Sequence, residues 1–212
     1  MNYANLIDDT NLHADAVESD IMALCNEAKE IGAASVCVNP DYIELSSKLL
    51  KGSNVKVCTV IGFPLGAMTT ESKVFEAQDA IKRGADEVDM VINISKLKDH
   101  KDDYVKNEVE SIKKACGVHV LKVILECCLL NDEEIERACI ICKEAGADFV
   151  KTSTGFSTHG ATVKDVALMR KTVGSKMGVK AAGGVRTPEE LKAMVEAGAN
   201  RIGASHGKNL VK

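Results

Sequence analysis

Short apolar runs alternate with longer segments of helical periodicity along the whole chain. Eight runs are typical of strands, at residues 5–8, 34–38, 55–60, 87–92, 118–125, 149–151, 179–181 and 201–202. Apolar residues recur at helical spacing between them, notably over residues 16–31, 70–83, 132–144, 163–172 and 188–197. Strands that alternate with helices indicate βα units and a parallel sheet.

A recurring local sequence marks four of the predicted helix ends. IGAASV, RGADEV, AGADFV and AGANRI each place Gly-Ala shortly before an apolar run. The glycines are Gly32, Gly84, Gly146 and Gly198, and the steps between them are 52, 62 and 52 residues. Glycine suits the position after a helix, where φ is positive. Each step is about two βα units long, which favours a repetitive architecture.

Eight βα units predict an α/β protein with a single (β/α)8 barrel domain over residues 1–212. No Pro/Ser-rich linker divides the chain, and 212 residues suffice for one domain. A doubly wound open sheet is the alternative, because periodicity alone does not establish closure.

Composition narrows the classes of function. The net charge is −4 without a marked basic patch, so we expect no nucleic-acid partner. The N-terminal segment lacks an apolar signal region and no apolar run has transmembrane length, so we expect a cytoplasmic protein that does not bind membranes. The eight cysteines are then reduced, and we interpret the pair Cys139 and Cys142 as packing residues rather than metal ligands.

Two lysines stand where an apolar run meets a glycine-rich loop. They are Lys151, in ADFVKTSTGF, and Lys180, in GVKAAGGVRT. Burial of a lysine is costly because desolvation disfavours its charge. Two such lysines indicate one amine tuned by another, as in Schiff-base enzymes. The alternative is that each side chain extends from its strand end to water.

Further charges accompany these lysines in the predicted strands. Lys122 and Glu126 are an even number of residues apart, so we expect them on one face. A self-compensating structural network is one explanation. Catalysis is the better one if the charges gather at the C-terminal ends of the strands, where barrel enzymes have their active sites. The six residues are Asp8, Asp89, Lys122, Glu126, Lys151 and Lys180.

Small residues and hydroxyls fill the loops after the sixth, seventh and eighth predicted strands. Barrels often bind phosphate with the last two of these loops, because glycine lets backbone N–H groups approach an anion. The alternative is that the glycines only form tight turns. Three such loops favour a phosphate site, with candidates Thr152, Gly155, Gly183, Gly184, Gly203, Ala204 and Ser205.

At these residues the chain resembles the 2-deoxyribose-5-phosphate aldolases, a family of class I aldolases. The resemblance covers almost the whole chain and rests on SVCVNP, VCTVIGFPLG, DEVDMVINI, KVILE, FVKTSTGF, ATVKDVALMR, VKAAGGVRT and RIGAS. It implies a (β/α)8 barrel that cleaves 2-deoxy-D-ribose 5-phosphate reversibly into acetaldehyde and D-glyceraldehyde 3-phosphate.

The resemblance also assigns roles. It implies that Lys151 forms the Schiff base, that Lys180 is the second lysine and that Asp89 is the acid of a proton relay. Lys180 would then favour the neutral form of Lys151 by like-charge repulsion. We expect Asp8 and Lys122 to belong to the same network.

For the phosphate loops, Gly183, Gly184, Gly203 and Ser205 match the family. The resemblance implies no metal and no cofactor, small sugar phosphates and aldehydes as partners, and a homodimer or homotetramer. Asp9, Cys127 and His206 depart from residues common in the family.

Two rival functions stay open on the residues alone. One is a barrel that binds a sugar phosphate without turnover. The other is a different phosphate-binding barrel enzyme, such as an isomerase or decarboxylase, which has no need of a second lysine to activate the first.

Overall fold

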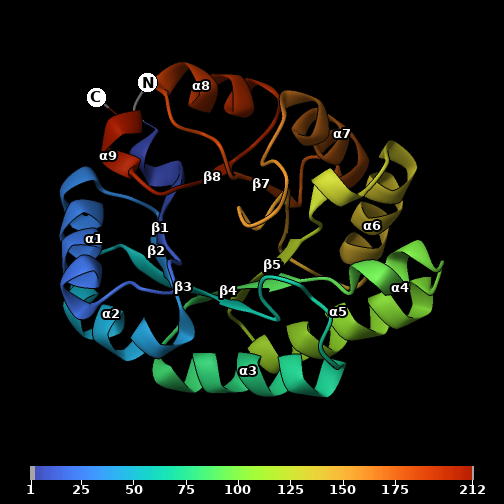
Figure 1. Ribbon diagram of the computed structural model, residues 1–212, viewed down its shortest axis with the longest axis horizontal. Helices are drawn as coiled ribbons and strands as arrows, with labels where there is room; N and C mark the ends of the chain where they lie inside the picture. The colour runs from blue at the N-terminus through green and yellow to red at the C-terminus, as the bar shows by residue number, and fades with distance from the viewer. Residues whose placement is uncertain (1–2, 212) are drawn as a thin grey trace.

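Eight parallel strands close into a barrel in the computed structural model, which describes residues 3–211. Each strand pairs with its neighbours in chain order, and β8 pairs with β1, so the sheet has no free edge (Figure 1). This closure confirms the barrel and excludes the open sheet. The strands are β1 (Ile7–Asn11), β2 (Ser35–Val38), β3 (Lys56–Ile61), β4 (Glu87–Val91), β5 (Val120–Ile124), β6 (Phe149–Lys151), β7 (Gly178–Ala182) and β8 (Arg201–Ala204).

The helices form a ring outside the strands (Figure 1). All five predicted helices are present with bounds within two residues. The first strand starts later than predicted, because a 3-10 turn (Ala4–Leu6) occupies the start of that run. Within residues 3–211, no helix is both long and apolar enough to cross a lipid bilayer. The α-helices are α1 (Glu18–Ile31), α2 (Ile43–Leu50), α3 (Thr70–Arg83), α4 (Ile94–Lys98), α5 (Asp102–Cys116), α6 (Asp132–Glu144), α7 (Val163–Val173), α8 (Pro188–Glu196) and α9 (Gly207–Leu210).

The four Gly-Ala segments end their helices in the same way. In each, the alanine N–H donates to the carbonyl oxygen five residues earlier, which satisfies one of the last carbonyls of the helix. The glycines have positive φ, as predicted: 72° at Gly32, 107° at Gly84, 79° at Gly146 and 113° at Gly198. One local solution therefore turns the chain from helix to strand at four places in the barrel.

Apolar packing lies mainly between the sheet and the helices. The outward face of the strands carries fully buried aliphatic residues such as Val88, Leu121 and Val150, which belong to one large core with the helices. Each such side chain stabilises the fold by roughly 1.5–3 kcal/mol. A smaller apolar cluster of Leu12, Cys37, Cys58 and Val60 is separate from this core. The outer layer thus supplies a continuous core and leaves much of the barrel interior to polar side chains.

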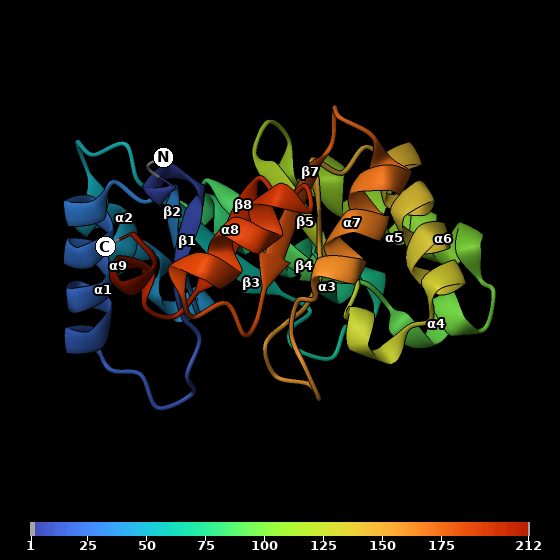
Figure 2. The same cartoon turned by 90° about the horizontal axis from the view of Figure 1, so that it is seen from above.

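The loops after β1 and β6 project from the same end of the barrel, where the strands finish (Figure 2). The loop after β6 is fixed to the loop after β7, because the N–H of Ala161 donates to the carbonyl oxygens of Ala182 and Gly183, at 3.0 Å each. A Cβ on Gly160 would lie 2.1 Å from the carbonyl oxygen of Gly183. Only glycine permits this approach.

Asp9 is a buried carboxyl on the outer face of β1. Its Oδ1 accepts the N–H of Gly207 at 3.1 Å, which attaches α9 to the first strand, while Oδ2 is buried without a hydrogen-bond partner. Burial raises the pKa of Asp9 to about 6, Glu27 adds to the effect, and the Gly207 N–H opposes it. The folded state therefore favours the protonated carboxyl.

We predict that Asp9→Asn stabilises the protein at neutral and higher pH. The folded-state pKa of Asp9 lies above the ordinary value, so the contribution of Asp9 to wild-type stability is fully present below about pH 4 and is lost as the pH rises through about 6. Asparagine resembles the protonated acid and keeps the acceptor for Gly207. Urea unfolding should show a gain on the order of 2 kcal/mol at pH 8 and almost none at pH 4.

The exposed Asp15→Asn substitution serves as the control and should show no comparable pH dependence. An Asp9→Asn gain of equal size at both pH values would contradict the explanation.

Candidate active site

Seven charged side chains from six strands fill the barrel interior and form what we call the interior cluster. The register brings them together: Lys122 pairs with Asp89, and Lys151 pairs with Lys180. Register partners on parallel neighbours point to the same face, so the matching positions of the two lysines predicted from sequence are confirmed. The members are Asp8, Glu87, Asp89, Lys122, Lys151, Lys180 and Arg201.

Asp89 is the centre of the cluster. Its Oδ2 accepts from the Nζ of Lys151 at 2.7 Å and from the Nζ of Lys180 at 2.8 Å, and its Oδ1 accepts from the Nζ of Lys122 at 3.0 Å. Burial alone would raise the pKa of Asp89, but the three lysines outweigh it and hold the pKa well below its usual range. Asp89 is therefore an ionised carboxylate shared by three amines.

Lys180 is held in its charged form. Its Nζ lies 2.5 Å from the Oδ2 of Asp8, in addition to its contact with Asp89. Burial works against the ammonium ion, yet Asp8 and Asp89 raise the pKa of Lys180 above its ordinary value. For Asp8 itself, burial is offset by Lys180, Lys122 and Arg201, which lower its pKa. A fixed positive charge thus stands beside Lys151.

Lys122 and Arg201 complete the part of the cluster that lies farther from the C-terminal ends of the strands. The Nζ of Lys122 contacts Glu87 and Asp89, and these carboxylates outweigh burial and raise the pKa of Lys122. Arg201 donates to both oxygens of Glu87, at 2.9 and 3.1 Å, and to Oδ1 of Asp8 at 2.6 Å.

Glu87 and Arg201 are cluster members that the sequence analysis missed. Each is the first residue of its strand, β4 or β8, and each lay within a predicted strand run. The criterion that singled out Asp89, a charge in an apolar run, would have found both.

Glu126 is not part of the cluster, and the expectation that it shares a face with Lys122 is wrong. It lies beyond the end of β5 with a left-handed φ of 58°, which interrupts the alternation of the strand. Its carboxylate accepts the backbone N–H of Thr154 at 3.1 Å and also the Thr154 hydroxyl. Glu126 therefore fixes the loop after β6.

The charges are also deeper than predicted. Asp8, Asp89 and Lys122 lie within their strands rather than at the C-terminal ends, and Lys180 is the middle residue of β7. Lys151 is the last residue of β6. A cavity of about 610 Å³ opens at this end of the barrel, and Lys151 is the member of the interior cluster that lines it.

Six of the seven phosphate-loop candidates line the same cavity as Lys151. These are Gly155, Gly183, Gly184, Gly203, Ala204 and Ser205. Thr152 is not brought to the cavity. It is fully buried, and its hydroxyl donates to the carbonyl of Ala182 at 3.2 Å and accepts the Ala182 N–H at 3.1 Å. Its side chain thus connects β6 to the end of β7.

The cavity wall includes polar residues that sequence reasoning did not select. Arg186 follows the glycine pair after β7, and His206 and Asn209 follow Ser205 after β8, where the departure at His206 was already noted. Thr10 and His13 line the wall from the end of β1 and its loop. Their signal was proximity to loops already identified, but only the fold shows which side chains face the cavity.

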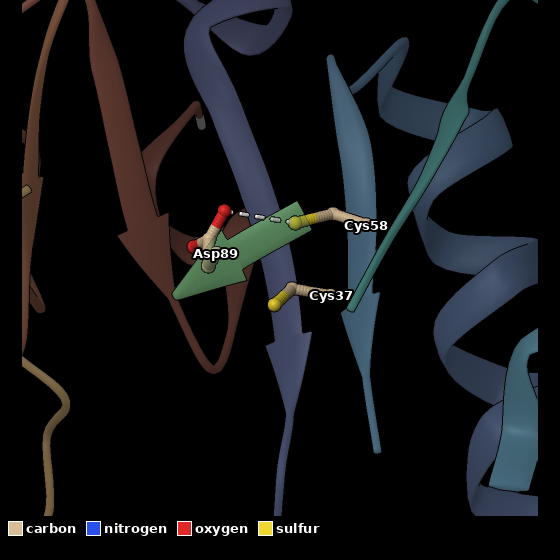
Figure 3. A group of neighbouring side chains, drawn as sticks. All are labelled: Cys37, Cys58 and Asp89. Carbon is tan, nitrogen blue, oxygen red and sulfur yellow. Dashed lines mark hydrogen bonds between the residues drawn. The ribbon is translucent and has the colours of Figure 1, made fainter. Parts of the chain in front are cut away.

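One group of side chains in the interior has the composition of a metal site. The thiols of Cys37 and Cys58 and a carboxylate oxygen of Asp89 lie within 4.8 Å of one another (Figure 3). The Cys58 thiol donates to Asp89 Oδ1 at 3.1 Å, and the Lys122 ammonium lies 3.0 Å from the same oxygen. A metal cation here would compete with the lysines for Asp89. The Asp89 carboxylate already accepts hydrogen bonds from the ammonium groups of Lys122, Lys151 and Lys180. The expectation of no metal stays a prediction.

The cysteines are free thiols, as predicted. Cys139 and Cys142 are buried within α6, and burial raises the pKa of both thiols above its ordinary value. Their interpretation as packing residues is confirmed.

Comparison with known proteins extends this picture. Residues 3–212 match the model of the DeoC/LacD family aldolases. The chain is 62% identical to a deoxyribose-phosphate aldolase of Thermoanaerobacter pseudethanolicus, over 100% of this chain and 96% of the relative. It is 61% identical to one from Bacillus subtilis, with the same coverage.

A solved structure agrees with these relatives. The deoxyribose phosphate aldolase from Aeropyrum pernix, described as a tetramer, superimposes with a TM-score of 0.90 at 36% identity, covering 99% of this chain and 89% of that one. The barrel, the interior lysines and these matches lead to one assignment: the chain belongs to the DeoC/LacD family of aldolases and is an enzyme.

Proposed function

We propose that the protein is a class I aldolase that reversibly cleaves 2-deoxy-D-ribose 5-phosphate into D-glyceraldehyde 3-phosphate and acetaldehyde through a Schiff base on Lys151. One observation carries this proposal. Of the three lysines that share Asp89, Lys151 is the one that lines the cavity, and a lysine held in its charged form lies next to it. The names of the relatives supply the substrate.

The first step requires a neutral amine on Lys151. An isolated lysine is almost wholly protonated at neutral pH. Lys180 and Lys151 contact the same Asp89 oxygen, so their like charges repel at short range. Since Asp8 and Asp89 keep Lys180 charged, the proton that leaves belongs to Lys151.

The carbon chemistry then uses the amine as an electron sink. Lys151 Nζ adds to the aldehyde carbon of the open-chain sugar, and loss of water gives an iminium ion. The C2–C3 bond breaks as the C3 hydroxyl loses its proton, and the bonding electrons form an enamine from C1 and C2 of the former sugar, which stays bound to Lys151 through C1. D-Glyceraldehyde 3-phosphate leaves. Protonation of the enamine carbon and hydrolysis of the new iminium release acetaldehyde and restore Lys151.

Lys180 is the group best placed to move protons, and Asp89 holds it next to Lys151. Asp89 has a strongly lowered pKa, so it accepts hydrogen bonds from both lysines and does not store the proton itself. We propose that protons pass between Lys151, a water in the cavity and the charged Lys180, with Asp89 orienting the amines. Asp8 fixes this arrangement through its contact with Lys180, and Lys122 fixes it through its contact with Asp89.

The phosphate of the substrate would lie against the loops after β6, β7 and β8. Gly183 and Gly184 have positive φ, of 82° and 84°, and with Gly203 they leave the loop backbone uncovered by side chains. Arg186 and His206 on the same wall add donors beyond those predicted. We also propose a cytoplasmic enzyme that forms a homodimer or homotetramer; the Aeropyrum pernix relative is described as a tetramer.

Replacement of Lys151 by alanine should reduce turnover to background, because no amine then faces the cavity. Borohydride reduction in the presence of acetaldehyde or deoxyribose 5-phosphate, followed by peptide mass spectrometry, should find the adduct on Lys151 of the wild type and none at this position in the variant. Lys171→Ala, at an exposed lysine, is the control and should keep both adduct and turnover. Turnover by a clean Lys151→Ala preparation would refute the Schiff-base role.

Lys180→Leu should shift imine formation to higher pH, since it removes the positive charge that shares one Asp89 oxygen with Lys151. We expect the pH of half-maximal trapping to rise by roughly one to three units. Lys73→Met is a matched control, because Lys73 is also fully buried and paired with a carboxylate, that of Glu108, but outside the cluster. An unchanged trapping profile in Lys180→Leu would remove its electrostatic role.

Ser205→Asp tests the phosphate site. A carboxylate in this loop should repel the phosphate and raise KM for deoxyribose 5-phosphate by about tenfold or more, equivalent to roughly 1.4 kcal/mol of binding free energy. Acetaldehyde carries no phosphate, so trapping of acetaldehyde on Lys151 should be unaffected. Equal losses with both compounds would mean that Ser205 acts elsewhere in the site.

A further inference from the structure

Arg201 is a cation in the floor of the interior cluster, at the end of the barrel opposite the cavity. It starts β8 and bridges two carboxylates, with Nη1 at 2.6 Å from Asp8 and 2.9 Å from Glu87. Its guanidinium lies 5.5 Å from the centre of the Phe149 ring. A Cβ on Gly178 would lie 2.1 Å from this ring, so the glycine leaves the space that the ring fills. The guanidinium is thus held by the two carboxylates and by the Phe149 ring.

This cation is permanent. Burial disfavours the charge, but Asp8 and Glu87 outweigh burial and raise the pKa of Arg201 above its ordinary value, with which arginine is already fully protonated in proteins. Lysine can lose a proton inside a protein, whereas arginine does not. Arg201 therefore contributes a positive charge to the cluster at every pH at which the protein is folded.

The cluster then has one positive charge in excess. When its three lysines are protonated, they and Arg201 make four cations, against the three carboxylates Asp8, Glu87 and Asp89. Each carboxylate is already shared by at least two cations. Loss of one proton would make the cluster neutral.

The geometry selects the lysine that gives up this proton. Lys122 contacts three carboxylates, with Asp8 at 3.8 Å as the most distant, and Lys180 contacts two. Lys151 contacts Asp89 alone within the cluster, and it faces the cavity through which a proton can leave. The excess charge is therefore relieved most easily at Lys151.

We propose that Arg201 is a positioning residue that keeps the interior cluster one positive charge in excess and so drives Lys151 to its neutral, nucleophilic form. It acts through Asp8 and Lys180 and does not touch the substrate. The proposal rests on the proposed function, because the neutral amine is the group that forms the Schiff base. It adds a residue that lies at the far end of the barrel from the cavity.

Among the other titratable groups near Lys151 and Arg201, Cys58 and Glu126 do not supply a fourth negative charge to the cluster. The Cys58 thiol donates to Asp89 and is therefore protonated, and burial raises its pKa well above the ordinary value. A hydrogen bond with Cys58 lowers the pKa of Cys37, so this thiol needs a direct test. Glu126 is directed to Thr154.

The test is the pH dependence of imine formation in a series of variants with different cluster charge. Acetaldehyde and cyanoborohydride would be added to the full-length protein between about pH 5 and about pH 10, and the modified fraction of Lys151 measured by peptide mass spectrometry. Arg201→Gln removes one positive charge and should raise the pH of half-maximal trapping by roughly one unit. Glu87→Gln removes one negative charge and should lower it by a similar amount.

Two further variants separate charge from packing. Arg201→Lys keeps the charge and should keep the wild-type midpoint. The double variant Arg201→Gln with Glu87→Gln has the wild-type charge excess and should return the midpoint towards that of the wild type. Loss of packing alone would not cancel in this way. Arg170→Gln is the matched control: Arg170 is a partly buried arginine on α7 that bonds backbone carbonyls outside the cluster, and its loss should leave the midpoint unchanged.

Several outcomes would overturn the proposal. Shifts in the same direction for Arg201→Gln and Glu87→Gln, or no shift in either, would show that the charge count does not control Lys151. A lower midpoint in Cys37→Ala would identify a thiolate that already balances Arg201. Absence of trapping in the wild type would instead refute the Schiff-base function, so the two failures are distinguishable. If Arg201→Gln does not fold, a lower midpoint in Glu87→Gln still supports the proposal and an unchanged or higher one overturns it; if Glu87→Gln does not fold, Arg201→Gln decides in the same way with the opposite sign.

Discussion

The sharing of one buried carboxylate by three amines governs the rest of this structure. Asp89 is fully buried and receives Lys122, Lys151 and Lys180 on its two oxygens. Removal of an ion from water costs several kcal/mol even after relaxation, so each charge persists only because the others surround it. Such a cluster tolerates little change, because loss of one partner leaves another unpaired. The proposed Schiff-base chemistry uses Lys151, the one of these three amines that also lines the cavity.

A polar interior has to be stabilised by apolar packing elsewhere. The outward face of the strands packs against the helices in a large aliphatic core, and the recurring Gly-Ala turns join helix to strand with little chain. Closure of the sheet leaves no edge to protect. Buried ion pairs rarely stabilise a fold more than apolar packing would. The interior cluster is therefore better understood as a functional feature. Its cost in stability is offset by the apolar packing between strands and helices.

Access separates the lysines that are otherwise alike. Lys122 and Lys180 are fully buried within their strands, whereas Lys151 is at the end of its strand and lines the cavity. Glu126 holds the backbone of the loop after β6 through Thr154, and Gly160 allows that loop to pack on the loop after β7. These contacts shape the cavity wall where the substrate phosphate is proposed to bind. The site thus depends on loops fixed by specific hydrogen bonds as well as on the charges below them.

The sequence by itself determined the repetitive βα architecture, four of the helix ends and the five charged residues Asp8, Asp89, Lys122, Lys151 and Lys180, because apolar periodicity and charges in apolar runs are local signals. It did not determine barrel closure, which depends on the pairing of β1 with β8. Only the tertiary structure showed that Glu126 lies outside the interior cluster, because its own backbone is left-handed. Only the tertiary structure showed that the Thr152 hydroxyl bonds Ala182 and does not line the cavity. Only the register across the closed sheet brought Glu87 and Arg201 into the cluster, since side chains 114 residues apart meet there.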